Sequence, residues 1–425
     1  MKKIKWGCIQ PLTGGMYIGA LQAIGNDAEW ILSYDGLDYA NTDKENNYTT
    51  VGNEYNLLKW LEKENKIIPY YKIKNRKMFD LNIYENNPDI YLDNKLENPD
   101  YNDLDLVVAV PVCSGLSMVT KGNTETKNSR NCNMLWLAYY TLNIIKPKVY
   151  CFENAPTLVG DRGDEVRKSL QDIAEKSGYS VLYYKTDTVL HDNCQRRPRT
   201  FVIFFKWQNN KQQTPPIFEY YNHPILVKEF FDKISSNASQ QIPVVSQPHN
   251  YILIDYLKEK LGDNWNTQFN GNIMNYVINN NLFDEFKAYI QNSKYSDNDK
   301  QKTLKYVNTI LSKKEEGKNY YSEDACLFNK YFPSVQFRSI PNMLHYSGER
   351  FCTIREYLSL MGLPENFELY GNESSLPKIG QNVPVGTAKF IVQQILNCLN
   401  NWNYINRVEG TNYIIQDNIK QTELN

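Results

Sequence analysis

The sequence of 425 residues lacks paired cysteines, clustered histidines and long hydrophobic runs. Its eight cysteines are scattered without a Cys-x-x-Cys pair, which argues against a disulfide framework and fits free thiols in a reducing compartment. The four histidines are equally dispersed, so a structural zinc site is not indicated. No run of about 18 apolar residues is present, which argues against a membrane span, and the N-terminal stretch has no signal-peptide core. We therefore expect a protein of the cytoplasm.

A strong charge of either sign is also missing. Lys and Arg together number 47 and Asp and Glu 48, which gives a net charge of −1. A nucleic-acid partner therefore cannot be inferred from the overall charge, and any phosphate-binding face has to be local. The length exceeds what a single hydrophobic core usually serves, so two domains are expected.

Residues 1–206 alternate short apolar runs with longer amphipathic stretches, which is typical of an α/β sheet with helices on its faces. Strands are expected at 4–9, 29–34, 106–111, 148–152, 180–185 and 200–206. Helices are expected between them at 16–25, 52–65, 130–145 and 163–177. This pattern predicts a catalytic and ligand-binding domain over residues 1–206.

The composition changes at Trp207, where a polar connector ending in two prolines begins. Residues 207–345 are rich in Asn, Gln and Lys and indicate a smaller, largely helical domain, inserted into the first. Its helices are expected at 225–236, 250–260, 283–292 and 298–315. Residues 346–425 are expected to return to the first domain and to end in a helix at 385–400 that packs onto the first strand.

Three polar groups stand at ends of the predicted strands. Cys113 follows the apolar run "LVVAVP", Glu153 lies near the end of "VYCFEN", and Arg197 and Arg199 precede "TFVIFF". The cysteine and the arginines have an ordinary explanation, because a strand-end cysteine is usually a packing residue and an arginine before a strand is often solvated. A glutamate that closes a buried strand, in contrast, loses solvation unless it has a partner or a task. Since ligands bind beyond the carboxyl ends of strands in α/β sheets, the four side chains can also converge on one site.

A thiol, a carboxylic acid and guanidinium groups suit the activation of carbon 5 of a pyrimidine. A thiolate that adds to carbon 6 makes carbon 5 nucleophilic. A glutamic acid at ring nitrogen 3 offsets the charge that develops there. Arginine donors hold the ring oxygen and favour the thiolate.

The motifs and their order resemble those of the DNA cytosine-5 methyltransferases, across most of the chain outside 207–345. Five segments carry the resemblance: "PVCSGLS" at 111–117, "ENA" at 153–155, "QRRPR" at 195–199, "REYLSLMGLP" at 355–364 and "GQNVP" at 380–384. Each of these short motifs is weak alone. Five of them in family order and with similar spacing are specific.

The resemblance implies a Rossmann-like S-adenosylmethionine-dependent methyltransferase domain with a mixed, mostly parallel sheet. By itself, the glycine turn after the first strand is also explained as a tight strand–helix connection. The implied catalytic residues are Cys113, Glu153, Arg197 and Arg199. The implied cofactor-binding residues are Gly14, Gly15, Asp35, Asp89, Pro111 and Asn382, with Asp35 near the ribose and Asp89 near the adenine.

Some positions depart from the family pattern. Gln10 and Leu12 stand where the family has an aromatic residue and a further glycine, and Ser33 stands at the ribose-binding glutamate. Val112 replaces the proline beside the nucleophile, and Gln381 replaces an asparagine. None of these changes touches the thiol, the glutamate or the arginine pair.

The resemblance implies methylation of a cytosine flipped out of double-stranded DNA, through a covalent cysteine adduct. A monomer is expected, in a bacterial cell or a phage-infected host. A cognate restriction enzyme, a solitary regulatory role and phage protection all stay open. Two alternatives are a catalytically silent DNA-binding homologue and an RNA-directed member of the same fold.

Overall fold

The structure of the protein is a computed structural model. The structure describes residues 3–25, 30–34, 54–66, 68–73, 103–111, 116, 129–209, 211–317, 324–335, 342–370, 376–401 and 412–421.

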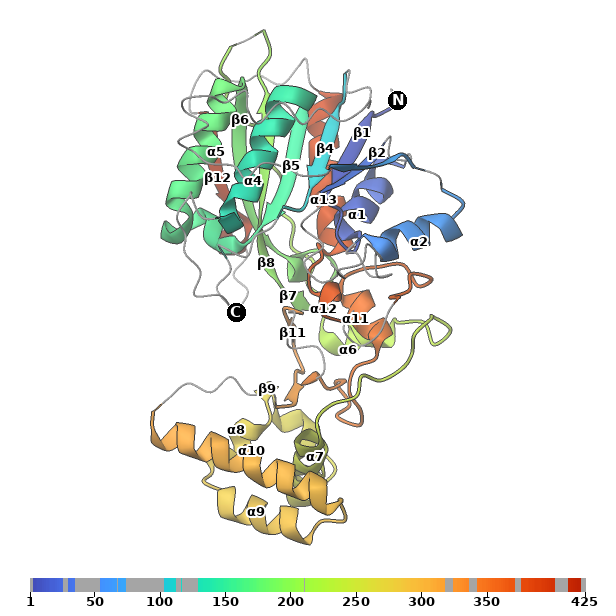
Figure 1. The fold of residues 1–425 in the computed structure, drawn as a ribbon, viewed down its shortest axis with the longest axis vertical. Helices are drawn as coiled ribbons and strands as arrows, with labels where there is room; N and C mark the ends of the chain where they lie inside the picture. The colour runs from blue at the N-terminus through green and yellow to red at the C-terminus, as the bar shows by residue number, and fades with distance from the viewer. Residues whose placement is uncertain are drawn as a thin grey trace.

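The described residues form an eight-stranded sheet in the order β12-β6-β8-β5-β4-β1-β2-β3 (Figure 1). The strands are β1 (Trp6–Ile9), β2 (Trp30–Tyr34), β3 (Tyr70–Ile73), β4 (Leu106–Ala109), β5 (Val149–Asn154), β6 (Tyr179–Asp187), β8 (Pro198–Lys206) and β12 (Tyr413–Asp417). All neighbours pair in parallel except β8, which runs antiparallel to both β5 and β6. The sheet is therefore mixed and mostly parallel, as predicted, and all six expected strands are present.

Two strands, β3 and β12, were not predicted from the sequence. β3 has the sequence "YYKI", which is too short and polar for a buried run. β12 lies at the sheet edge, and its Tyr413 and Ile415 are partly exposed, so burial does not impose a hydrophobic run on it.

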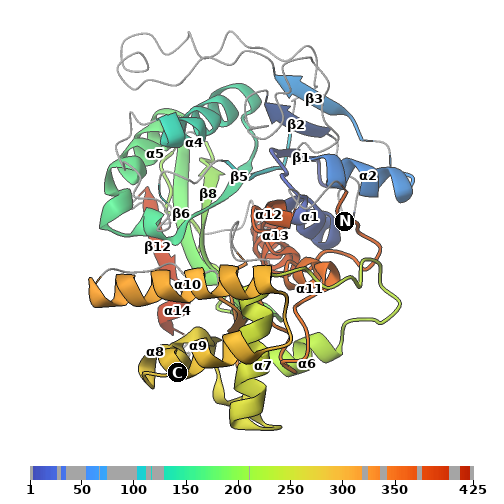
Figure 2. The same ribbon diagram turned by 60° about the horizontal axis from the view of Figure 1, so that its bottom comes forward.

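Helices cover both faces of the sheet, and successive strand residues alternate between the two sides. One hydrophobic cluster joins α1 (Gly15–Ile24), α2 (Tyr55–Lys63) and α13 (Val385–Asn400) to Val108 and other residues of one face. The other cluster joins α4 (Ser129–Tyr140) and α5 (Asp164–Lys176) to Val107 and the opposite face. Figure 2 shows α4 and α5 on the side of the strands away from α1 and α13.

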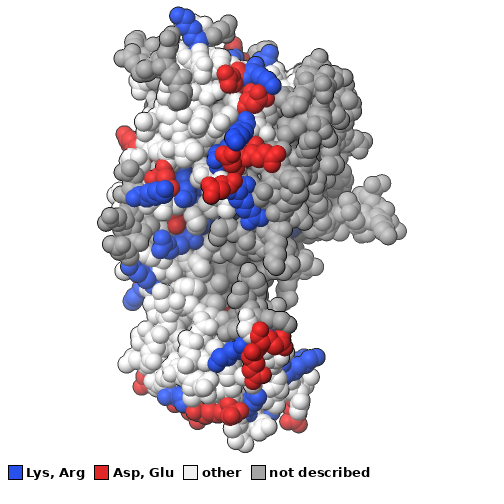
Figure 3. Space-filling view, turned by 90° about the vertical axis from the view of Figure 1, so that its left-hand side faces the viewer, with Lys and Arg blue, Asp and Glu red and all other residues white. Residues whose placement is uncertain are grey.

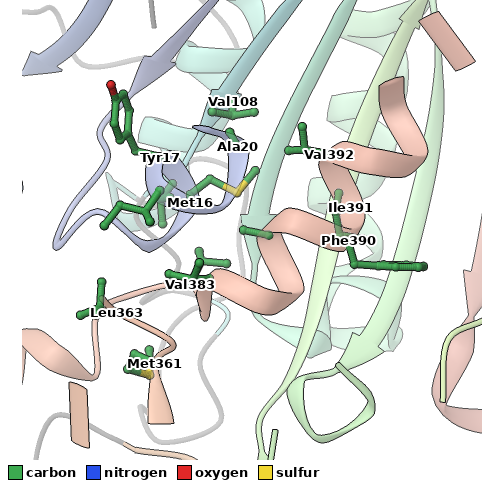
Figure 4. Close-up of a cluster of buried hydrophobic side chains, with 14 of the residues drawn as sticks. Met16, Tyr17, Ala20, Val108, Met361, Leu363, Val383, Phe390, Ile391 and Val392 are labelled. Atoms are coloured by element: carbon green, nitrogen blue, oxygen red, sulfur yellow. The ribbon is translucent and has the colours of Figure 1, made fainter. Parts of the chain in front are cut away.

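The last long helix, α13, packs mainly along α1, whereas the sequence analysis expected it on the first strand. Figure 4 shows Phe390, Ile391 and Val392 of α13 in one cluster with Met16 and Ala20 of α1. The reason for this correction is steric. A Cβ atom on Gly19 would lie 2.6 Å from the Cβ of Ala388, so the missing side chain lets the two helices approach closely.

A helical lobe lies below the sheet in Figure 1 and has a hydrophobic cluster of its own. It contains α7 (Pro248–Leu261), α8 (Met274–Asn279), α9 (Phe283–Asn292) and α10 (Asp297–Glu315). Its cluster includes Trp265, Phe286 and Val307, all almost completely buried. The expected helices at 250–260, 283–292 and 298–315 are confirmed, and α8 was not anticipated.

Shorter elements join the lobe to the sheet. They are α6 (Val227–Asp232), β7 (Gln195–Arg196), β9 (Gly271–Asn272), β10 (Cys326–Leu327), β11 (Phe332–Pro333), α11 (Ile354–Leu360), α12 (Leu376–Ile379) and α14 (Asn418–Gln421). β10 pairs with β9 inside the lobe, and β11 pairs with β7 next to the sheet. Val227 and Phe231 of α6 belong to the large cluster of α1 and α13, so α6 packs with the sheet domain. Among the described helices, none is long and apolar enough to cross a membrane.

Candidate active site

The candidate site lies where the carboxyl ends of β1, β4 and β5 meet the beginning of β8. The chain runs from β1 outward to β2 and β3 and then returns to β4 on the other side of β1. Such a reversal of strand order leaves a crevice beyond the carboxyl ends, which is where open α/β sheets bind ligands. The topology therefore brings the predicted residues of β1, β4, β5 and β8 to one edge.

Glu153 and Arg199 form an ion pair at this edge. Glu153 in β5 lies opposite Phe201 in β8, and Arg199 precedes Phe201 by two residues, so it is on the same face. Arg199 Nε is 2.6 Å from Glu153 Oε1. The carboxylate side chain is 5% exposed and the arginine 20%, so the arginine retains access to the site. The structure thus brings two predicted catalytic residues into direct contact.

Arg197 is almost completely buried and uses its guanidinium group within the protein. Its Nη1 donates to the Val335 carbonyl at 2.8 Å and to Ser334 Oγ at 3.2 Å. Its Nη2 donates to the carbonyls of Gly380 and Asn382, both at 2.8 Å. Arg197 therefore connects residues 334–335 with residues 380–382, whereas Arg199 contacts the Glu153 carboxylate.

The glycine turn after β1 is held by the segment before α13. Gly14 has a φ of 108°, a left-handed conformation that favours glycine. The Gly15 amide donates to Asn382 Oδ1 at 2.7 Å, and a Cβ on Gly15 would lie 1.8 Å from the Val383 carbonyl oxygen. The missing Gly15 side chain is thus explained by the approach of Val383, which the sequence analysis did not anticipate. Two predicted cofactor residues, Gly15 and Asn382, are in contact.

Gln10 departs from the family pattern in the sequence, and in the structure it is a buried polar residue at the candidate site. It directly follows β1 at the crevice, is completely buried and has a φ of 52°. Neither its Oε1 nor its Nε2 has a hydrogen-bond partner among the described residues. A buried amide without partners is costly, and a polar ligand at this edge would relieve that cost. The unpartnered Gln10 amide therefore fits a polar cofactor at this edge. In the sequence, the feature that could have identified Gln10 as a site residue is its position as a polar residue directly after a buried strand.

Three predicted residues, Cys113, Asp35 and Asp89, lie outside the described residues. Pro111, which was predicted to contact the cofactor, is buried just after β4. Leu116 is also buried, and its carbonyl accepts a hydrogen bond from the Thr157 hydroxyl, four residues beyond Glu153. The described neighbours on both sides of Cys113 therefore lie at the same sheet edge as Glu153.

Four other cysteines near the predicted motifs are packing residues. Burial raises the pKa of the Cys8, Cys151, Cys194 and Cys352 thiols above the ordinary range. All four side chains are completely buried. Since the thiolate is the nucleophilic form, these cysteines are inert at neutral pH.

Comparison with known proteins assigns the family. Residues 52–397, most of the chain, match the model of the C-5 cytosine-specific DNA methylase family. The protein therefore belongs to this family, as the order of its motifs predicted.

The particular relatives are distant. A type II methyltransferase of Bacillus paralicheniformis, M.Bpa9945I, is 25% identical over 184 residues. The match covers 39% of this chain and only 38% of the length of that relative.

Two solved structures share the fold. A protein described as a DNA modification methyltransferase encoded within an Escherichia coli prophage is 15% identical, with a TM-score of 0.50 over 93% of this chain and 99% of its own. The Entamoeba histolytica methyltransferase EhMeth is 12% identical, with a TM-score of 0.52 over 94% of this chain and 99% of its own. These likenesses confirm the predicted Rossmann-like methyltransferase fold.

Proposed function

We propose that the protein is a DNA cytosine-5 methyltransferase that uses S-adenosylmethionine and acts on double-stranded DNA. Membership of the family supports the reaction class. The observation that carries the proposal is the Glu153–Arg199 pair at the carboxyl edge of the sheet. This pair places a carboxyl group, which can carry a proton, and a cation 2.6 Å apart, which matches the edge of a cytosine ring.

The proposed reaction begins with the Cys113 thiolate, which forms a bond to carbon 6 of the flipped cytosine. As this bond forms, the electrons of the carbon 5–carbon 6 double bond shift into a carbon 4–carbon 5 double bond, and the carbon 4–nitrogen 3 pair moves onto nitrogen 3. That nitrogen takes up a proton from the protonated Glu153 carboxyl, and Arg199 donates to the ring oxygen. The bound cofactor supplies an electrophilic methyl group on a sulfonium. After carbon 5 is methylated, a base removes its proton, the sulfur–carbon 6 bond breaks, the carbon 5–carbon 6 double bond is restored and the proton on ring nitrogen 3 returns to Glu153.

The cofactor side of the proposal rests on the turn after β1. Gly14 and Gly15 shape the turn, and Asn382 fixes it through the Gly15 amide. Pro111 is proposed to line the same crevice, and Asp35 and Asp89 keep their proposed contacts with the ribose and the adenine. The unpartnered amide of Gln10 supports a polar ligand here.

The domain roles follow the same reasoning. Residues 1–206 and 346–425 are proposed to bind the cofactor and perform the chemistry, and residues 207–345 to recognise the target sequence. The separate hydrophobic cluster of the helical lobe supports an independent unit inside this insert. The DNA is proposed to lie between the two parts.

The test is a covalent adduct. Fluorine at carbon 5 cannot leave as a cation, so 5-fluorocytosine arrests the reaction after methyl transfer. We expect a duplex pool of randomised sequence that carries 5-fluorocytosine, incubated with S-adenosylmethionine, to form a protein–DNA adduct that survives denaturing electrophoresis. Cys113→Ser removes the thiolate and should abolish the adduct.

The matched control is Cys398→Ser, the same change at a partly buried thiol on α13, which should leave the adduct unchanged. An adduct in the Cys113→Ser protein, or a mass spectrum that places the base on another cysteine, would contradict the assigned nucleophile. Bisulfite sequencing of DNA from expressing cells then identifies the target site. No adduct and no methylation in either experiment would favour the catalytically silent homologue, and adducts confined to RNA would favour the RNA-directed one.

A further inference from the structure

Arg197 is hydrogen-bonded to two segments that are far apart in the sequence, and buried residues in or beside both segments belong to the large cluster of α1 and α13. One segment, residues 331–335, is the chain returning from the helical lobe toward the sheet (Figure 1). The other, residues 380–382, precedes α13 and holds the glycine turn. The buried guanidinium group lies between them and donates to both.

On the lobe side, the returning chain is fixed by Gln195 of β7 and by Arg197, which lies between β7 and β8. β11 pairs with β7, so Phe332 lies beside Gln195. The Gln195 side chain accepts from the Val335 amide at 3.0 Å, and Arg197 donates to the Val335 carbonyl. The backbone of Val335 is thereby held at both its amide and its carbonyl.

On the cofactor side, the contacts continue to the turn after β1. Arg197 donates to the Asn382 carbonyl, and the Asn382 side chain accepts from the Gly15 amide. The Thr13 hydroxyl also donates to the Lys378 carbonyl at 2.9 Å. Two hydrogen bonds thus lead from the Arg197 guanidinium to the backbone of Gly15.

We propose that Arg197 is a positioning residue that couples DNA binding at the helical lobe to cofactor binding at the Gly14–Gly15 turn. This inference rests on the proposed function, since it names how the two ligands of that function influence each other. A guanidinium group is planar, so its two terminal nitrogens cannot move independently. A shift of residues 334 and 335 therefore has to shift residues 380 and 382 or break their hydrogen bonds.

The direction of the coupling follows from the ordering that both ligands require. A ligand that orders one segment also orders the other through Arg197, so the second ligand loses less conformational freedom when it binds. The coupling is then positive and reciprocal: the cofactor tightens DNA binding by the same factor as DNA tightens cofactor binding. Couplings of this kind are typically about 5- to 150-fold.

The experiment compares four dissociation constants for the full-length protein. S-adenosylhomocysteine is titrated by calorimetry with and without a duplex pool of randomised sequence, and the duplex is titrated by fluorescence anisotropy with and without S-adenosylhomocysteine. For the wild type we expect each ligand to tighten the other about five-fold or more. In Arg197→Lys, whose single ammonium cannot bridge both segments, the ratio should fall to near one while each ligand alone still binds.

Arg355→Lys is the matched control. Arg355 is also completely buried, and it also donates to backbone carbonyls, those of Ser239, Pro364 and Phe367. None of these three acceptors belongs to the segments that Arg197 joins. Arg355→Lys should therefore lower stability as Arg197→Lys does but keep the wild-type ratio.

Two further variants keep the test decisive if Arg197→Lys does not fold. Ser334→Ala removes one hydrogen bond on the lobe side, and Asn382→Ala removes the bond to Gly15 on the cofactor side. Both should lower the ratio. A wild-type ratio of one, or a ratio that stays at the wild-type value in all folded Arg197, Ser334 and Asn382 variants, would overturn the coupling. Wild-type protein that binds neither ligand would instead contradict the proposed function itself.

Discussion

At the scale of single residues, the site is defined by how buried polar groups find partners. Glu153 is paired with Arg199, and Arg197 is surrounded by carbonyl and hydroxyl acceptors. The two arginines are two positions apart in β8 and its approach, yet only Arg199 contacts the carboxylate. Each arginine therefore needs its own set of acceptors, because a buried charge without partners costs free energy.

The substitution Glu153→Gln distinguishes the proposed proton transfer by Glu153 from its structural contact with Arg199. The amide oxygen still accepts from Arg199, whose side chain is 20% exposed and keeps contact with water, so the melting temperature should fall only moderately. The amide cannot deliver a proton. Methylation, measured by transfer of a tritiated methyl group to DNA, should fall about 10²- to 10⁴-fold. A variant that keeps wild-type turnover would show that Glu153 is only a structural partner of Arg199.

His191 carries a pH dependence of stability. Burial lowers the pKa of His191 from its ordinary value of 6.5 to about 3, so the native ring is neutral. It stacks on Tyr221, and one ring nitrogen is 2.8 Å from Thr186 Oγ1. In the unfolded chain the His191 ring takes up a proton below a pH of about 6.5, whereas in the native protein it stays neutral down to about 3. The contribution of His191 to the free energy of unfolding is therefore fully present above pH 6.5 and declines as the pH falls toward 3.

We therefore expect His191→Gln to be less stable at pH 7 but to lose less stability between pH 6.5 and about 4, as measured by urea unfolding. His223→Gln, an exposed ring that also contacts Tyr221, is the control and should keep the wild-type pH dependence. Equal slopes in the wild type and in His191→Gln would refute this origin of acid sensitivity.

At the scale of elements, the contact between α1 and α13 closes the sheet domain. The segment from Asn382 to Ala388 approaches α1 at Gly15 and at Gly19, where no side chain intervenes. Figure 4 shows that Val383 and residues of α13 face Met16 and Ala20. The same approach sets the turn that is proposed to bind the cofactor, so packing and function share these positions.

Gly15→Ala should therefore be destabilising. Its Cβ would lie 1.8 Å from the Val383 carbonyl oxygen, so the backbone has to shift, and overpacking of this kind typically costs about 1–3 kcal/mol. The free energy of unfolding in urea measures the loss. At Gly160, where an added Cβ would be 3.6 Å from its nearest neighbour, the same substitution is the control and should cost much less. Equal losses at both sites would contradict the steric explanation.

At the scale of the whole molecule, charge is distributed without a dominant sign. The face in Figure 3 shows Lys and Arg interspersed with Asp and Glu, in line with the net charge of −1. A locally basic groove of about 870 Å³ does lie along α9 and α10, where three lysines, Lys287, Lys305 and Lys313, outnumber one carboxylate, Glu316. Its other lining side chains are amides, hydroxyls and Leu304. No ion pair joins these three lysines to a described carboxylate.

DNA affinity should consequently weaken steeply with salt despite the negative net charge, because phosphate contacts release counterions. If the groove contacts the backbone, changing Lys287, Lys305 and Lys313 to Gln should reduce the slope of log K against log salt by about one for each lysine. Fluorescence anisotropy at several salt concentrations measures the slope.

The control changes three exposed lysines that each already pair with a carboxylate four residues earlier: Lys168, Lys176 and Lys233. Their replacement by Gln should leave the slope unchanged. A triple groove variant with the wild-type slope would show that this surface does not contact DNA.

The sequence by itself determined the elements and the family. Buried strands such as "VYCFEN" appear as hydrophobic runs because both faces of the sheet are covered, and helices such as α5 follow from their periodicity. The motif order predicted the family because it depends only on residue type and spacing. These properties depend on residue type and on order along the chain, so they can be recognised in the sequence without the structure.

Only the tertiary structure decided which residues meet. The packing of α13 on α1, the contact of Val383 with Gly15 and the use of Arg197 for carbonyls of two distant segments all join residues separated by more than one hundred positions. Local propensity contains no information on such pairs, because they are selected by the close packing of the whole chain and by the need of each buried polar group for a partner. The same holds for Gln10, because the lack of a partner for its buried amide is evident only once its surroundings are known.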